Sequence, residues 1–263
     1  MPPTQESSKQ IAFHDVLPLL EALSEDESIA VIGGQALNFW AERFPDKFKQ
    51  YAPFESGNLD LLGDAVTAAE CARLWRGELL LPEPFSPSPV NAVVEVKCAG
   101  KKISVQFLGG VRGLGNQDVK RLCVTVKSGK TIIKVLDAVA CLESRVHNFC
   151  GLPGRNTPAH LSRIGLAIAV ALDHTARLAK TNAEVALSTA ERILALARGH
   201  DGLRLYVNYK LDLLDTIPRE GLPRIFYKEH FNRTQVWLQE RRERYASLVA
   251  SISRPPPKSG PPR

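Results

Sequence analysis

Residues 30–44, AVIGGQALNFWAERF, place a short apolar run directly before two glycines and a helix-like pattern. The run of small and β-branched residues predicts a buried strand, and the apolar residues after the glycines recur at helical spacing. Gly33 and Gly34 therefore stand at a strand-to-helix turn. Glycine lets the backbone approach a ligand closely, and the free N–H groups of a helix's first turn favour an anion.

Residues 56–64, SGNLDLLGD, supply the second part of a candidate site. Residues two apart on a strand share a face, so Asn58 and Asp60 point one way while Leu59 and Leu61 point into the core. Two acidic side chains in that register would hold Mg²⁺ through oxygen ligands. Here only Asp60 is acidic, because Asn58 offers an amide oxygen without charge. Asp60 is therefore the candidate metal ligand.

A predicted hairpin over residues 92–108 supplies the third part. Val105 and Phe107 are expected to face the core, with Gln106 on the opposite face. A two-residue turn at Gly100-Lys101 would pair Glu95 with Gln106 and place both side chains on the same side. A slip of one residue would move Glu95 to the other face.

The pattern of predicted helices and strands divides the chain into two regions. Helix and strand patterns alternate over residues 10–136, whereas residues 137–253 consist of one predicted helix after another. The predicted fold class is α+β, with a mixed-sheet domain followed by an all-α domain and a cleft between them. Residues 1–9 and 254–263 are rich in proline, serine and glycine, and we expect them to be disordered.

Composition and charge indicate which kinds of binding partner the protein can have. No apolar run reaches the ~18–20 residues that span a bilayer, which argues against a membrane partner. Five dispersed cysteines are typical of reduced thiols, so a cytoplasmic location is expected. The net charge is +6, and the whole excess lies after residue 201, where twelve basic residues face six acidic ones. Arg241, Arg242 and Arg244 on a predicted helix form either a solvated face or a nucleic-acid contact.

The three parts, in this order, resemble the nucleotidyltransferase superfamily with the polymerase-β-type fold. Within it, the chain looks most like the bacterial AbiEii-type proteins of the abortive-infection and toxin–antitoxin group. The family pattern is a strand, Gly-Gly or Gly-Ser opening a helix, Ser/Thr-x-Asp-x-Asp on the next strand, and a third Asp on a later strand. VIGGQAL at 31–37 matches the first element, SGNLD at 56–60 lies on the second, and VQFLGGVRGL at 105–114 lies on the third.

The resemblance also assigns roles to individual residues. The stretch 135–149, VLDAVACLESRVHNF, resembles the first helix after the sheet, where relatives carry a basic residue near the nucleotide. The implied nucleotide-binding residues are Gly33, Gly34, Gln35, Ser56 and Arg145. The implied catalytic set is Asp60, Asn58 and Gln106, to which the predicted hairpin register adds Glu95.

The resemblance implies transfer of a nucleoside monophosphate from an NTP to an RNA, tRNA or protein acceptor, with two Mg²⁺ ions held by three carboxylates. An antitoxin protein is a further implied partner. Asn58 and Gln106 stand where two of those aspartates are expected, which removes about two negative charges from the metal cage. Three functions therefore stay open: an active transferase using Asp60 and Glu95, a catalytically degenerate nucleotide-binding or regulatory module, and an interaction module using the basic C-terminal helix.

Overall fold

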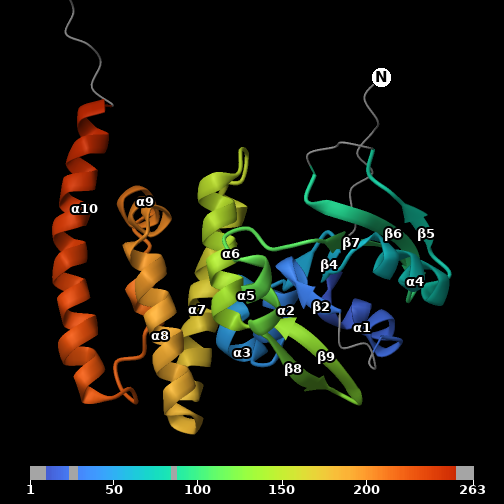
Figure 1. Cartoon of the computed structure of the whole chain (residues 1–263), viewed down its shortest axis with the longest axis horizontal. Helices are drawn as coiled ribbons and strands as arrows, with labels where there is room; N and C mark the ends of the chain where they lie inside the picture. Colours follow the sequence, from blue (N-terminus) through green and yellow to red (C-terminus); the bar gives the residue numbers. More distant parts are fainter. Residues whose placement is uncertain (1–9, 24–28, 84–87, 253–263) are drawn as a thin grey trace, which may run out of the picture. The chain divides into compact units, whose positions relative to one another are not determined.

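A computed structural model describes residues 10–23, 29–83 and 88–252. It divides the chain into two compact units, of which the first ends at His174 and the second begins at Thr175. The first unit combines helices with a mixed sheet, and the second is helical, which confirms the predicted α+β class (Figure 1). The two termini that were expected to be disordered lie outside the described residues.

A mixed seven-stranded sheet forms the centre of the first unit. The strand order is β5-β6-β7-β4-β2-β9-β8, with β4–β7 and β2–β9 parallel and the other neighbours antiparallel. A separate antiparallel pair joins β1 to β3. The strands are β1 (Ile11–Ala12), β2 (Ala30–Ile32), β3 (Glu55–Ser56), β4 (Leu59–Leu62), β5 (Glu78–Leu80), β6 (Val90–Cys98), β7 (Lys101–Leu108), β8 (Cys123–Ser128) and β9 (Thr131–Leu136).

The helices of the first unit pack on this sheet, with α2 in contact with both β4 and α6. They are α1 (Phe13–Glu21), α2 (Gly33–Glu42), α3 (Pro45–Phe48), the 3₁₀ turn η1 (Lys49–Tyr51), α4 (Ala65–Trp75), α5 (Asn116–Arg121), α6 (Ala138–Gly151) and α7 (Pro158–Thr181), whose last turns belong to the second unit. The second unit continues with α8 (Ala183–Arg198), α9 (His200–Tyr209), the 3₁₀ turn η2 (Leu213–Thr216), the π-helical turn η3 (Phe226–Phe231) and α10 (Asn232–Ile252).

The alternation of the central strands is confirmed by burial. Leu59, Leu61, Val105 and Phe107 are all fully buried, whereas the residues between them are partly accessible. The unit boundary differs from the predicted end of the sheet domain at residue 136. Since α6 packs against α2, this helix and most of α7 belong to the first unit.

The predicted register of the hairpin is wrong by two residues. The turn lies at Ala99-Gly100, where both residues have positive φ (49° and 76°), and Cys98 pairs with Lys101. Both central residues of such a tight hairpin turn have positive φ, a conformation that alanine rarely adopts. The sequence therefore favoured a turn one residue later, at Gly100-Lys101. In the observed register Glu95 is opposite Ser104.

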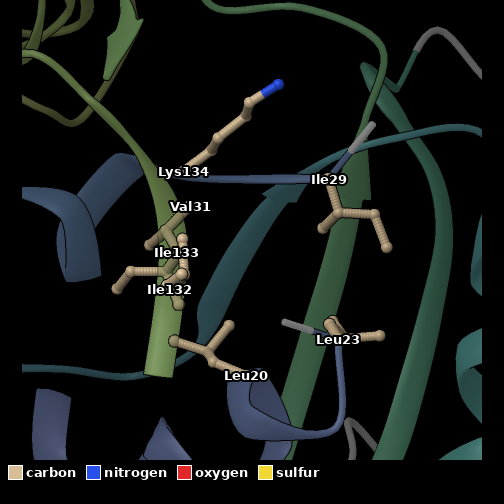
Figure 2. Close-up of a pocket in the computed structure, with 7 residues that line it drawn as sticks. All are labelled: Leu20, Leu23, Ile29, Val31, Ile132, Ile133 and Lys134. Atoms are coloured by element: carbon tan, nitrogen blue, oxygen red, sulfur yellow. The ribbon is translucent and has the colours of Figure 1, made fainter. Parts of the chain in front are cut away.

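A small hollow lies between α1, β2 and β9 (Figure 2). It encloses about 20 Å³ and is lined by Leu20, Leu23, Ile29, Val31, Ile132, Ile133 and Lys134. The six aliphatic side chains make it a packing defect with room for about one water molecule. Among the described residues, the helices are all too short or too polar to cross a membrane.

Candidate functional site

A cleft of about 660 Å³ in the first unit brings together residues from segments that are far apart in the sequence. Asp60 on β4 is the direct neighbour of Gln106 on β7, and Ile32, which precedes the glycine turn, is opposite Asp60 on the other side. The sequence-predicted residues that line the cleft are Gly33, Gly34, Ser56, Asn58, Asp60, Gln106 and Arg145. The convergence that the patterns implied is therefore present in the fold.

The turn from β2 into α2 requires glycine for two independent reasons. Gly33 has φ +63°, a conformation that side chains disfavour. In addition, a Cβ on Gly33 would overlap the carboxylate oxygen Oδ2 of Asp60. A Cβ on Gly34 would lie 2.9 Å from Cβ of Ser56 and 3.3 Å from Nη2 of Arg145. The two glycines thus let Asp60, Ser56 and Arg145 crowd around the start of α2.

Asp60 is the electrostatic centre of this turn. Its carboxylate accepts hydrogen bonds from the side-chain amide of Asn58 and from the backbone N–H of Gly34. Burial raises the pKa of the Asp60 carboxyl, while the nearby Arg145 guanidinium and these two hydrogen bonds oppose the rise. Burial likewise lowers the pKa of the Arg145 guanidinium. A desolvated carboxylate and a desolvated guanidinium therefore face one cleft.

The donor set around Asp60 does not match a two-metal cage. Asn58 directs its N–H₂ group rather than its oxygen at Asp60, and Gln106 adds a second neutral amide. Across residues 10–23, 29–83 and 88–252, nowhere do three or more His, Cys, Asp or Glu side chains gather closely enough to hold a metal ion. The lone Asp60 carboxylate falls short of the three that a two-metal cage uses. Its oxygens also already accept hydrogen bonds from Asn58 and from the backbone N–H of Gly34, which competes with a metal ion for them.

Two residues of the predicted site lie outside the cleft. Glu95 is opposite Ser104 and forms an ion pair with Lys102 at 3.2 Å, so it does not restore the missing charge beside Asp60. The cause is the earlier hairpin turn. Gln35 is fully buried and donates a hydrogen bond to the backbone oxygen of Ile11 at 2.9 Å. It points into the core because the first turn of α2 faces the β1–β3 pair there.

Three basic or titratable residues of the cleft were not predicted from the sequence: Arg155 in the α6–α7 loop and His160 and Arg163 on α7. Arg155 contacts Nε2 of His160 at 2.9 Å, and burial together with Arg155 lowers the pKa of this histidine. Burial and the charge of Arg145 lower the pKa of Arg163 to about 10. The three-residue spacing of His160 and Arg163 on one helical face is visible in the sequence, but their nearness to Gly34 is not.

The basic cluster on α10 differs from its prediction at one residue. Arg242 is only 6% exposed and forms a two-pronged ion pair with Asp212, and its guanidinium lies over the ring of Tyr206. Arg241 and Arg244 remain exposed, and Arg241 stacks on Trp237. A nucleic-acid contact on this face would therefore lack one of its three expected arginines.

Comparisons with protein-family models, with curated proteins and with solved structures each found no match to this chain. The geometry of the cleft is therefore the basis for a function.

Proposed function

We propose that the first unit binds a nucleotide in this cleft, as a nucleotidyltransferase-like module without two-metal transfer chemistry. The observation that carries the proposal is the convergence of the Gly33-Gly34 turn, Asp60 and Arg145 on one cleft. This is the arrangement that the family resemblance implies for the nucleotide. The neutral side chains at 58 and 106 are the reason to propose binding rather than transfer.

The lining of the cleft suits the two chemical parts of a nucleotide. Arg145, Ser56 and Asn58 provide polar contacts for phosphate and sugar, and Val90, Leu108, Phe149 and Leu152 provide apolar surface for a base. The volume of about 660 Å³ is within the usual range for small-molecule sites. Small-molecule sites commonly combine such an apolar wall with a few placed polar groups.

The test is calorimetric titration of the full chain with ATP, comparing Gly34→Ala with Gly115→Ala. The methyl group on Gly34 would displace Ser56 and Arg145, so we expect ATP affinity to fall about 10-fold, equivalent to ~1.4 kcal/mol. Gly115 lies outside the cleft with φ −65°, and a Cβ there meets only the end of the Asp118 side chain. The control should therefore bind ATP as the wild type does. Equal affinities for both variants would refute the proposed location.

A second arm distinguishes binding from transfer. Incubation with α-³²P-labelled NTPs, Mg²⁺ or Mn²⁺ and total tRNA should leave both protein and RNA unlabelled. Covalent label that disappears in Asp60→Ala would contradict the proposal and establish an active transferase with a rearranged site.

A further inference from the structure

The cleft concentrates positive charge on one wall. Arg145 on α6, Arg155 in the following loop and Arg163 on α7 all line it. Burial is the main cause that lowers the pKa of Arg163 and of Arg145. The charge of Arg145 adds to this effect at Arg163, and the charge of Arg155 adds to it at Arg145. Like charges held together in a partly desolvated cleft repel one another, so such an arrangement is costly unless an anion lies between them.

Carboxylates of the protein neutralise this wall only in part, through Asp60, which interacts with both Arg145 and Arg155. Glu55 and Asp60 are the acidic residues among the described cleft-lining residues. Within the part of the chain that the structure describes, none of the three arginines forms an ion pair with a carboxylate. The lining thus has three arginines against two carboxylates, and the excess positive charge faces the cleft.

Arg163 is held in place by a chain of buried amides. Its guanidinium donates to Oδ1 of Asn38, Asn38 donates to Oε1 of Gln35 at 3.2 Å, and Gln35 donates to the backbone oxygen of Ile11 at 2.9 Å. Asn38 and Gln35 are both 0% exposed, so neither amide has water as an alternative partner. A guanidinium carries five N–H donors, and this chain occupies one side of it while the rest faces the cleft.

We infer that the cleft takes a ligand with two or more adjacent phosphate groups, and that Arg145, Arg155 and Arg163 supply its cationic contacts without a divalent metal ion. The inference rests on the proposed nucleotide site and specifies its ligand class and its metal independence. Arginine forms paired, charge-assisted hydrogen bonds with phosphate oxygens. Three guanidinium groups along one lining provide paired donors for more than one phosphate group, which favours a di- or triphosphate chain over a single phosphate.

The experiment titrates the full-length chain with ATP, AMP and inorganic tripolyphosphate, first in EDTA and then in excess Mg²⁺. In EDTA we expect ATP and tripolyphosphate to bind, with AMP at least about 10-fold weaker, since each charged hydrogen bond contributes about 10-fold or more. Excess Mg²⁺ converts ATP to the Mg–ATP complex, which carries two fewer negative charges. Because the Asp60 oxygens already accept hydrogen bonds from Asn58 and Gly34, we expect ATP to bind no more tightly with Mg²⁺ than in EDTA.

Matched arginine variants test the named contacts. Arg155→Gln removes an exposed side chain that lines the cleft, so folding is preserved and ATP affinity in EDTA should fall about 10-fold. Arg73→Gln removes the same charge from the exposed face of α4, outside the cleft, and should bind ATP within about 2-fold of the wild type. An equal loss of ATP affinity in both variants would mean that only the net charge of the protein matters, and it would overturn the inference.

The ligand panel separates the two proposals. Binding of ATP that requires Mg²⁺ would overturn metal independence while leaving the nucleotide site intact. Tight binding of tripolyphosphate without binding of ATP would support the polyphosphate site and refute the nucleotide. Absence of binding by either ligand in both buffers would overturn both.

Discussion

The arginines of the two units are placed in opposite electrostatic situations. In the second unit, Arg242 is buried against Asp212, which contacts it through both carboxylate oxygens, and against the ring of Tyr206. In the first unit, Arg145 is desolvated with Asp60 nearby but shares its cleft with Arg155 and Arg163. A buried arginine with its own carboxylate has a structural role. Cleft-lining arginines in excess of carboxylates indicate a site for an external anion.

The largest effect is expected for the paired arginine. Arg242→Met leaves Asp212 without its partner in a partly buried position, so the free energy of unfolding should fall by about 3 kcal/mol. Urea denaturation of the full chain measures it. The double variant Arg242→Met/Asp212→Leu removes both charges and should recover most of the loss. A double variant as unstable as the single one would show that the aromatic contact with Tyr206, and not the ion pair, stabilises the unit.

The glycine turn of the cleft should show the next largest effect. Gly33→Ala and Gly129→Ala both place alanine at nearly the same positive φ, +63° and +62°, which costs about 1–2 kcal/mol in each. Only at Gly33 would the added methyl group overlap Asp60, whereas open space surrounds Gly129. We expect Gly33→Ala to lose at least about 1 kcal/mol more in urea denaturation and to lose ATP binding. Equal losses would mean that Asp60 moves aside freely.

A cleft arginine should affect binding far more than stability, in contrast with Arg242. Arg145→Gln removes a desolvated charge near Asp60, which keeps its hydrogen bonds from Asn58 and from the backbone N–H of Gly34. Because burial already raises the pKa of Asp60, its carboxyl can also become neutral, so we expect the free energy of unfolding to fall by less than about 1 kcal/mol. ATP affinity should fall about 10-fold or more. Calorimetry and urea denaturation on the same preparation measure both. A loss of about 3 kcal/mol in stability would assign Arg145 the same structural role as Arg242.

The smallest effect is a pH dependence that originates at Asp60. Burial raises its pKa above the unfolded value of 3.8, so the folded state holds this proton more tightly than the unfolded chain does. The stability that the folded state gains from holding this proton is fully present below about pH 3.8. It is lost as the pH rises through the folded pKa of Asp60. Asp60→Asn does not titrate, so its stability should improve relative to the wild type as the pH rises from about 3.8 through the folded pKa of Asp60. Urea denaturation across that range measures the difference, and an opposite trend would mean that Arg145 outweighs burial.

Much of the fold follows from patterns that are local in the sequence. Strand alternation predicted the buried Leu59 and Phe107, and the family resemblance implied that Asp60 and Gln106 belong to one site, where the two are neighbours on adjacent strands. The register of the β6–β7 hairpin did not follow, because Ala99 adopts a positive φ that its residue type gives no reason to expect. The error displaced Glu95 from the cleft to an ion pair with Lys102.

The composition of the cleft was only partly predictable for a different reason. Arg163 is more than a hundred residues from the glycine turn, and it approaches because α7 packs on the same unit and because Asn38 and Gln35 hold its guanidinium. The helical periodicity of α2 predicted burial of its apolar face. A series of buried polar side chains joined by hydrogen bonds gives no such periodic pattern in the sequence. Tertiary contacts of this kind decided which charges surround Asp60.

The most direct test of the account is a crystal structure of the full chain with a non-hydrolysable ATP analogue, grown in EDTA. The account predicts phosphate oxygens at about 3 Å from guanidinium nitrogens of Arg145 and Arg163, with the base against Phe149 and no cation on Asp60. An analogue bound elsewhere on the protein, or one that enters the cleft only with Mg²⁺ coordinated by Asp60, would contradict it.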